Sequence, residues 1–420
     1  MSFCQVLGEA DPSWNDDTRR WSMHMHIIMN KHLETIRRTK SRVRSVFLFS
    51  VGELPKKHLL GTLAVNFKLL KVLDLQGAPL DQLHEEVGNL LHVRYLSVKR
   101  TKVKIIPKSI GNLHNLQTLN FKYLNVHVLQ IKILSKLRKL RHLIASPSFL
   151  GGVKMQGRIG HLEELQILWD VVANNDEEGV SLTAIKELEN LRQLRKLGIR
   201  DLKRESGKGL CNAIEKMKHL QYLRVWAIKD EILDLHCLSS PPESLQRFSL
   251  RGRLEMLPNW IPKLDNLVAL GLYSSGLIEL KFHDGCDEEK LYIGVGRFWK
   301  LKLLHLRGLK GLKVVTIEEG GLPVLNELWI GDCPQLKEVP SCIRNLRELK
   351  SLYFTDMPTE FLDRLQPDKG QDYQAVEHVP NVQFTPAEIR RYPAYHQIIK
   401  ERYNPQEYYG HDVRKAKGSM

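Results

Sequence analysis

A chain of 420 residues with a formal net charge of +15 attracts acidic partners of many kinds, although this excess does not define a fold. No run of about eighteen apolar residues occurs, so we expect no membrane span. The first residues lack a basic start and an apolar core, which argues against a signal peptide. The six cysteines form no Cys-x-x-Cys pair and no Asn-x-Ser/Thr sequon is present, so we expect a cytoplasmic or nuclear protein without disulfides or zinc.

The chain begins with a lead-in that we expect to cap a larger structure. Residues 1–18 are polar and predict irregular structure, whereas residues 20–26 alternate between apolar and polar side chains and predict a strand. Residues 31–41 indicate a short basic helix or connector, and residues 43–48 a degenerate first repeat. We therefore assign residues 1–66 to an N-terminal lead-in and cap.

A hexamer of the form Leu-x-x-Leu-x-Leu starts at Leu70 and recurs until Leu349. Its central apolar residue lies at Leu73, Leu96, Leu119, Leu143, Leu168, Leu197, Leu223, Phe248, Leu270, Leu304, Leu328 and Leu352. In a strand, side chains alternate between faces, so the last two apolar residues of each hexamer point to the same side. Self-similarity at this spacing is the signature of a leucine-rich repeat solenoid.

A single repeat cannot fold alone. Ordering roughly two dozen residues costs about 1–2 kcal/mol each, which exceeds the gain of about 1.5–3 kcal/mol from each of three buried aliphatic side chains. Neighbouring repeats must therefore stack. We predict an α/β fold, a horseshoe-shaped solenoid over residues 67–355 with a concave parallel sheet and a convex side of mixed helical and irregular segments.

The segments that return from one hexamer to the next are of two kinds. Residues 106–113, 257–264 and 339–346 are compact and carry proline, which fits where the chain leaves a strand. Residues 181–191 and 207–220 place apolar residues at helical spacing, so we expect helices that face the core.

Two insertions and a change of pattern near the end complete the chain. Residues 172–180 and 282–296 are expected to be loops, the second accounting for the longest interval between hexamers. The second loop contains His283, Asp284, Cys286 and Asp287, but their loose clustering favours a solvated loop over a metal site. We predict a closing cap at 356–382 and a basic, flexible tail at 383–420.

No catalytic motif is present. The sequence lacks a Walker phosphate loop, Gly-x-Ser-x-Gly, His-Glu-x-x-His and a dinucleotide-binding Gly-x-Gly-x-x-Gly. Cys333 follows a hexamer where such repeats often carry Asn or Cys, so we expect a buried structural thiol. The sequence therefore predicts a binding protein, with no enzymatic activity, cofactor or metal.

The variable positions of the hexamers, which face solvent on the predicted concave sheet, are rich in cations and aromatic residues. Asp74 and Glu327 are the acids that we find among them. Arg, Tyr and Trp are the residues enriched at interface hot spots, so these positions predict a site for a protein with an acidic surface. The candidate residues are Arg94, Arg141, Trp169, Arg195, Arg200, Tyr222, Arg224, Trp226, Arg247, Arg251, Tyr273, His305, Arg307 and Trp329.

Several stretches resemble a known family. Residues 71–77 (KVLDLQG) resemble the start of the leucine-rich repeat region in plant NLR disease-resistance proteins of the coiled-coil class, and residues 18–22 and 43–46 resemble its lead-in strands. Residues 372–380 are similar to the segment that closes this region in grass members. The likeness spans about residues 18–382.

The chain also departs from the family pattern. The coiled coil, the nucleotide-binding domain with its phosphate loop and the Met-His-Asp motif of the family have no counterpart here, and residues 23–26 (MHMH) are not that motif. The resemblance therefore implies a truncated or partial resistance protein without the nucleotide switch. In the family, this region keeps the switch off and recognises pathogen effectors.

Three hypotheses follow. The first is a recognition module of plant innate immunity that binds a pathogen effector, a guarded host protein or a nucleotide-binding domain through its basic concave face. The second is a general intracellular scaffold for signalling proteins, similar to the plant Ras-group leucine-rich repeat proteins, although the uneven repeats here differ from theirs. The third is nucleic-acid binding through the same charge, which predicts a steep dependence of affinity on salt.

Overall fold

The computed structural model describes residues 5–7, 20–24, 43–49, 59–124, 131–145, 153–154, 159–173, 180–228, 231–252, 258–273, 290–295, 298–366 and 369–384. The chain divides into two compact units, an N-terminal unit of residues 1–276 and a C-terminal unit of residues 277–420. Each unit consists of stacked repeats with its own row of buried leucines. Residues 31–41, the metal-like cluster at 283–287 and residues 385–420 lie outside the described part.

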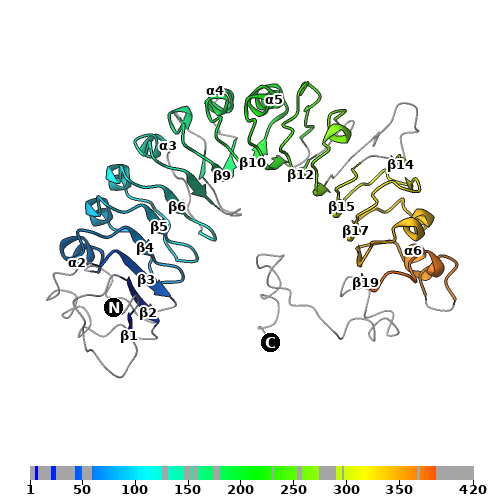
Figure 1. Cartoon of the computed structure of the whole chain (residues 1–420), viewed down its shortest axis with the longest axis horizontal. Helices are drawn as coiled ribbons and strands as arrows, with labels where there is room; N and C mark the ends of the chain where they lie inside the picture. Colours follow the sequence, from blue (N-terminus) through cyan, green and yellow to red (C-terminus); the bar gives the residue numbers. More distant parts are fainter. Residues whose placement is uncertain are drawn as a thin grey trace. The chain divides into compact units, whose positions relative to one another are not determined.

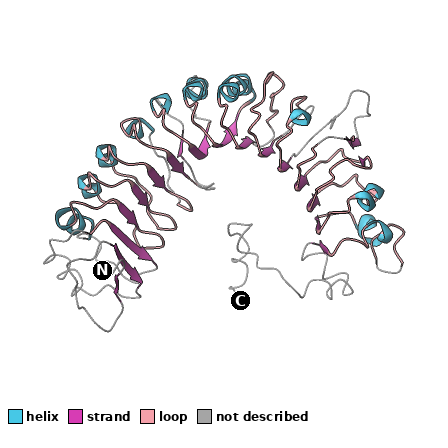
Figure 2. Cartoon of the chain, in the orientation of Figure 1, coloured by secondary structure: helices cyan, strands magenta, loops and turns pink. Residues whose placement is uncertain are grey.

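Parallel strands line one side of the N-terminal unit. Figure 1 shows them on the inner side of its curve, with the helices on the outer side, and Figure 2 shows the same division by secondary structure. The strands are β1 (Gln5–Leu7), β2 (Arg20–His24), β3 (Ser45–Phe49), β4 (Val72–Asp74), β5 (Tyr95–Ser97), β6 (Thr118–Asn120), β7 (His142–Ile144), β8 (Val153–Lys154), β9 (Ile167–Val172), β10 (Lys196–Leu202), β11 (Tyr222–Ala227), β12 (Arg247–Arg251) and β13 (Ala269–Tyr273).

The predicted hexamers form the rungs of this sheet. Leu73 of β4 pairs with Leu96 of β5, and the pairing passes from strand to strand through the central hexamer residues as far as Leu270 of β13. Each of these central residues is at most 1% exposed. A stacked row of aliphatic side chains therefore holds the unit together, and the prediction of a leucine-rich repeat solenoid is confirmed.

The return segments of this unit are helical. The α-helices are α2 (Leu59–Asn66), α3 (Ile131–Leu134), α4 (Val180–Glu187) and α5 (Gly207–Lys216). The 3-10 helices are η1 (Glu85–Asn89), η2 (Lys108–Asn112), η3 (Ile159–His161), η4 (Leu188–Asn190), η5 (Arg204–Ser206) and η6 (Ile261–Lys263). The two predicted helices are present as α4 and α5, and two of the proline-bearing returns form the short turns η2 and η6.

The C-terminal unit repeats the same plan with fewer helices. Leu304 of β15, Leu328 of β17 and Leu352 of β18 pair in parallel register and are buried. Its elements are β14 (Lys290–Ile293), β15 (Leu303–Arg307), β16 (Val314–Ile317), β17 (Glu327–Gly331), η7 (Ser341–Asn345), β18 (Ser351–Thr355), α6 (Thr359–Asp363), η8 (Tyr373–Ala375) and β19 (Asn381–Phe384).

Three expectations about local structure were wrong. Gln5–Leu7 lies in the stretch expected to be irregular, yet its apolar residues form β1, which pairs with β2. Lys290–Ile293 lies within the predicted loop at 282–296, but it is a return strand that pairs with β16 and buries Leu291 and Ile293. Asn381–Phe384 continues the sheet as β19 beside β18, across the predicted border between cap and tail.

Candidate protein-recognition surface

The outward face of β11 carries Tyr222, Arg224 and Trp226, because the alternate residues Leu223 and Val225 point into the core. The parallel register sets Tyr222 beside Arg247 of β12 and Trp226 beside Arg251. On the next strand, Tyr273 of β13 pairs with Arg251. The fold thus brings together side chains that the sequence spreads over about fifty residues.

A bulge in β9 changes what this face presents. Leu168 pairs with Leu197 and Val171 pairs with Ile199, so Trp169 and Asp170 both lie opposite the single residue Gly198. Asp170 has a left-handed φ of 57°, which suits the extra residue of a bulge. Val171 is fully buried and takes the core position that the hexamer pattern assigns to Asp170.

Gly198 leaves room for contacts that cross β10. A β-carbon at this position would lie only 2.9 Å from Cε3 of the Trp169 ring, so the indole packs directly over the glycine. Arg224 on β11 also reaches across, and its Nη2 donates a hydrogen bond to Oδ1 of Asp170 on β9 at 2.6 Å. Two strands separated by β10 are therefore linked by one ion pair.

Aromatic rings enclose this ion pair. The guanidinium carbon of Arg224 lies 4.1 Å from the ring centroid of Trp169 and 4.8 Å from that of Trp226. Trp169 also packs against Tyr222 with centroids 4.8 Å apart, and Arg251 lies 5.4 Å from the centroid of Trp226. Such cation–π contacts gain strength when water is excluded, so they help to hold the side chain of Arg224 in place.

The ion pair is largely removed from solvent. The side chain of Asp170 is 4% exposed and that of Arg224 is 16% exposed. Burial raises the pKa of the Asp170 carboxyl above its usual value, while the charges of Arg224 and Arg200 oppose this shift. The charge of Arg224 is therefore compensated by Asp170, whereas Arg247 and Arg251 of β12 are exposed, as is Lys196 of β10. We call Trp169, Asp170, Tyr222, Arg224, Trp226 and Arg251 the arginine–tryptophan cluster.

The remaining candidates of the N-terminal unit lie around the cluster. Arg200 is half-buried on β10, near enough to Asp170 to influence its carboxyl. Arg94, Arg141 and Arg195 are exposed and precede strands. Arg141 Nε donates to Oε2 of Glu164 at 3.1 Å, but both side chains are nearly half exposed, so this pair contributes little to stability.

Three candidates, His305, Arg307 and Trp329, belong to the C-terminal unit. His305 and Trp329 lie in register with Tyr353 on β15, β17 and β18. The ring centroids of His305 and Trp329 are 4.9 Å apart, and those of Trp329 and Tyr353 stack at 3.8 Å. Burial lowers the pKa of His305 to about 4, so its imidazole is neutral at pH 7. We call His305, Trp329 and Tyr353 the aromatic row.

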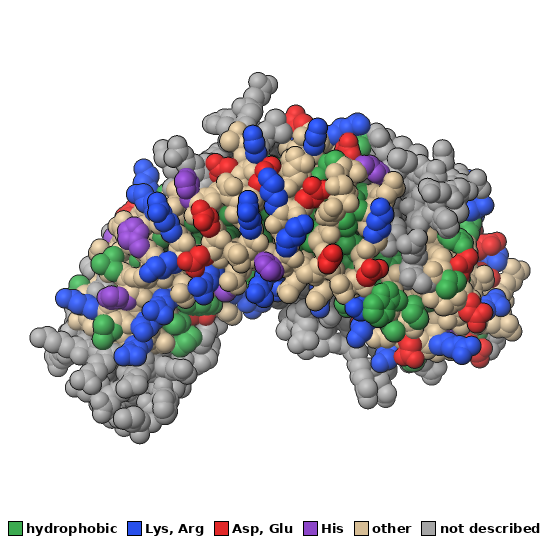
Figure 3. Space-filling view, turned by 45° about the horizontal axis from the view of Figure 1, so that its top comes forward, with side chains coloured by type: hydrophobic (Ala, Val, Ile, Leu, Met, Phe, Trp, Pro, Cys, Tyr) green, Lys and Arg blue, Asp and Glu red, His purple; other side chains and the backbone are tan. Residues whose placement is uncertain are grey.

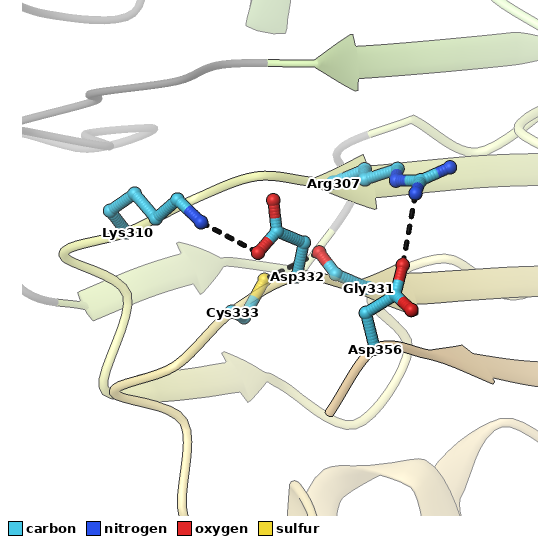
Figure 4. A network of polar contacts seen from close by, with 6 residues as sticks. All are labelled: Arg307, Lys310, Gly331, Asp332, Cys333 and Asp356. Atoms are coloured by element: carbon cyan, nitrogen blue, oxygen red, sulfur yellow. Dashed lines mark hydrogen bonds and ion pairs between the residues drawn. The ribbon is translucent and has the colours of Figure 1, made fainter. Parts of the chain in front are cut away.

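Two ion pairs lie at the ends of β15, β17 and β18, and Figure 4 shows them. Arg307 Nη2 donates to Oδ2 of Asp356 at 3.0 Å, and Lys310 Nζ donates to Oδ1 of Asp332 at 2.6 Å. The thiol of Cys333 donates to the Gly331 carbonyl at 3.2 Å, and burial raises its pKa to about 11. Cys333 is thus a buried structural thiol, as its position in the repeat predicted.

Asp170 is the residue of the candidate site that sequence reasoning missed. The expected acids of the outward face were Asp74 and Glu327, because strict alternation assigns Asp170 to the core. A signal was available. The sixth residue of its hexamer, which is apolar in the other repeats from Leu70 to Phe354, is an aspartate here. A charged residue at a core position indicates a paired charge or a shift of register.

Charge is less one-sided than the composition implied. On the face drawn in Figure 3, Lys and Arg side chains are interspersed with Asp, Glu and His.

Among the described residues, no three His, Cys, Asp or Glu side chains gather closely enough to hold a metal ion. Within the same residues, no helix combines the length and the apolar character that a membrane crossing requires.

Comparison with known proteins defines the family. The family model described as "Leucine-rich repeat region" matches residues 42–284, more than half of the chain, and the chain belongs to this family. The internalin InlF of Listeria monocytogenes aligns with a TM-score of 0.53 and 14% identity, covering 85% of this chain and 89% of that structure. This likeness shows the fold alone.

Relatives narrow the class to plant disease resistance proteins. Probable disease resistance RPP8-like protein 4 of Arabidopsis thaliana is 26% identical over 340 residues, which cover 76% of this chain and 36% of the relative. Disease resistance protein RPM1 of the same plant is 29% identical over 268 residues, which cover 58% of this chain and 28% of the relative. The chain thus spans roughly a third of the length of such relatives and corresponds to the leucine-rich repeat region of NLR proteins, as the resemblance implied.

Proposed function

We propose that this chain is a non-enzymatic protein-recognition module of plant innate immunity and that its partner docks on the sheet around the arginine–tryptophan cluster. The partner would be a pathogen effector, a guarded host protein or a nucleotide-binding domain with an acidic surface. The relatives support a defence-related protein-interaction module, and we infer a cytoplasmic or nuclear location from the sequence.

One observation carries this proposal. Trp169 and Trp226 both contact the guanidinium of Arg224, which is hydrogen-bonded to the buried carboxylate of Asp170. The two tryptophans and Tyr222 are half-buried, so parts of their rings remain open to solvent. Rigid aromatic anchors lose little conformational entropy on binding and are the residues that dominate interfaces.

The three arginines of this face have different roles in the proposed interaction. Because Arg224 is neutralised by Asp170, it organises the face, and the exposed Arg247 and Arg251 supply the charge that attracts an acidic partner. Complementary charge at the rim of an interface speeds association and sets specificity. A partner would therefore contact tryptophan rings at the centre and place its acids toward β12.

The test replaces the exposed arginines and leaves the cluster's buried pair intact. Affinity capture from infected leaf extract is compared for the wild type, Arg247→Glu/Arg251→Glu, and Lys186→Glu/Lys208→Glu, in which exposed lysines of α4 and α5 undergo the same change of charge. We expect a protein retained by the wild type and the lysine variant to be lost from the arginine variant. For that protein, once purified, affinity should fall at least about tenfold.

Three results would contradict the proposal. Equal loss from the arginine and lysine variants would mean that the net charge of the chain, and not this face, attracts partners. Capture dominated by signalling enzymes that are insensitive to either variant would favour the general scaffold. A steep fall of affinity for duplex DNA with rising salt would favour nucleic-acid binding.

A further inference from the structure

Two cysteines of the N-terminal unit face each other across neighbouring repeats. Cys211 lies on α5, and Cys237 lies in the return segment of the following repeat. Both are free thiols, the first buried and the second exposed. The side chain of Cys237 is a hydrogen-bond partner of the Cys211 thiol. Neither residue takes part in the arginine–tryptophan cluster.

The surrounding contacts fix this arrangement independently of the thiols. Gly207, Cys211 and Glu215 are spaced four residues apart, so they form one stripe along α5. At one end, a β-carbon added at Gly207 would overlap the carbonyl oxygen of Asp234. At the other end, Oε1 of Glu215 accepts hydrogen bonds from the backbone N and the hydroxyl of Ser239, both at 2.7 Å.

These two contacts align the helix stripe with the return segment. Cys237 follows Asp234 and precedes Ser239, just as Cys211 lies between Gly207 and Glu215. The helix and the segment are thus pinned on both sides of the cysteine pair, and the backbones can approach closely because residue 207 has no side chain. A disulfide requires this closeness, since its α-carbons are usually about 4.4–6.8 Å apart.

We propose that Cys211 and Cys237 form a reversible disulfide that staples two neighbouring repeats when the chain meets a peroxide. The exposed sulfur of Cys237 attacks one oxygen of the peroxide, the O–O bond breaks, and a sulfenic acid and water form. The sulfur of Cys211 then attacks the sulfur of Cys237. The S–O bond breaks, and the departing hydroxide takes the thiol proton and leaves as water.

The balance of the reaction is complete. Two thiols are oxidised to one disulfide, and one hydrogen peroxide is reduced to two waters. Burial raises the pKa of Cys211, so its thiol stays protonated in the reduced chain, and the exposed Cys237 is the sulfur that meets the peroxide first. A dithiol reductant reverses the reaction by thiol–disulfide exchange.

The staple would enclose the centre of the recognition face. The whole of β11, with Tyr222, Arg224 and Trp226, lies between Cys211 and Cys237 in the chain. Oxidation would therefore close a covalent loop of residues 211–237 that includes β11, and it would suppress local opening of this repeat. The disulfide itself does not rest on the proposed function, because it is detected by its chemistry alone.

The test uses the full chain, first reduced and freed of reductant, then exposed to hydrogen peroxide. After remaining thiols are blocked with N-ethylmaleimide, trypsin digestion without reduction should give a cross-linked peptide that joins residues 209–216 to residues 230–247. A phosphine reductant should separate the two peptides. Amide hydrogen exchange of α5 and β11 should slow several-fold in the oxidised chain.

Two variants serve as controls. Cys237→Ser, at an exposed position, should lose both the cross-linked peptide and the slower exchange, whereas Cys333→Ser, which removes a buried thiol of the other unit, should retain both. Oxidation of Cys237 to sulfinic acid, with Cys211 still free to react with maleimide after denaturation, would overturn the proposal. A disulfide from Cys237 to any other cysteine would overturn it as well.

Discussion

The arginine–tryptophan cluster and the aromatic row occupy equivalent places on the sheets of the two units, yet they are built in opposite ways. In the N-terminal unit, β9 bulges at Trp169 and Asp170, and a buried charge pair ties two strands across a third. In the C-terminal unit, β15, β17 and β18 pair without any shift of register, and the ring of Trp329 stacks on Tyr353 and meets the neutral ring of His305 edge to face.

This difference shows that the repeat backbone does not determine which side chains lie on the solvent-facing side of the sheet. The leucine rungs are the same in both units, so stability of the stack is supplied from the core side. The open face is then able to carry either a buried charge pair or a row of packed rings. A site with a buried charge pair is destabilised when either partner is removed. The aromatic row is instead sensitive to loss of ring packing and to protonation of His305 at low pH.

The largest effect is expected from Arg224→Ala. Removing the guanidinium leaves the carboxylate of Asp170 buried and unpaired, which should lower the free energy of unfolding of the N-terminal unit by about 3–5 kcal/mol. Hydrogen exchange in β9–β11 during urea titration measures it, since one global midpoint does not describe a chain of two units. Asp170→Ala/Arg224→Ala should recover part of the loss, and a cost below about 1 kcal/mol for the single variant would contradict the buried pair.

An intermediate effect is expected from acid in the C-terminal unit. Burial lowers the pKa of His305 from the ordinary histidine value of 6.5 to about 4. As pH falls below 6.5, the imidazole therefore becomes protonated in the unfolded chain but stays neutral in the folded chain. The contribution of the neutral imidazole to the free energy of unfolding is fully present above pH 6.5, and up to about 3 kcal/mol of it should be lost as pH falls toward 4.

His305→Gln isolates this contribution. The free energy of unfolding of the C-terminal unit, measured by hydrogen exchange in β15 and β17 between these two pH values, should depend less on pH in the variant than in the wild type. Parallel curves for the two proteins would show that the imidazole titrates normally and that the aromatic row does not shield it.

The smallest effect is expected at the glycine beneath Trp169. Gly198→Ala places a methyl group 2.9 Å from the indole and 3.1 Å from the backbone N of Asp170, which should cost about 1–3 kcal/mol. Gly294→Ala is the matched control, because its added carbon would meet neighbours at 3.5 Å and should be neutral or slightly stabilising. Hydrogen exchange in β9–β11 for Gly198→Ala and in β14 for Gly294→Ala measures each effect in its own unit, and an unchanged opening free energy in Gly198→Ala would argue against the close packing over β10.

Much of the fold could be predicted from local pattern. The spacing of the hexamers predicts the parallel pairing of Leu73 with Leu96 and its continuation along the sheet, because only in-register stacking buries every rung. The helical spacing of residues 181–191 and 207–220 likewise predicts α4 and α5. The return strand at Lys290–Ile293 escaped prediction because a short apolar run beside an acidic stretch carries no period of its own.

The candidate site was predictable in part. The alternation within β11 and β12 indicates that Tyr222, Arg224 and Arg247 face outward, and the structure places them there. The pairing of Arg224 with Asp170 was not predictable, because it depends on a one-residue bulge and on a partner fifty-four positions away. A bulge reverses the facing of the residues beyond it, so alternation alone misplaces the acid.

The sequence by itself determined the stack of leucine rungs, the family and the outward positions of the hexamers, since each depends on periodic burial that any repeat expresses locally. The tertiary structure decided which outward residues meet. It paired Arg224 with Asp170, stacked Trp329 on Tyr353 and brought Cys211 to Cys237. These contacts join different repeats, and their geometry depends on register shifts and close backbone approaches that no single repeat contains.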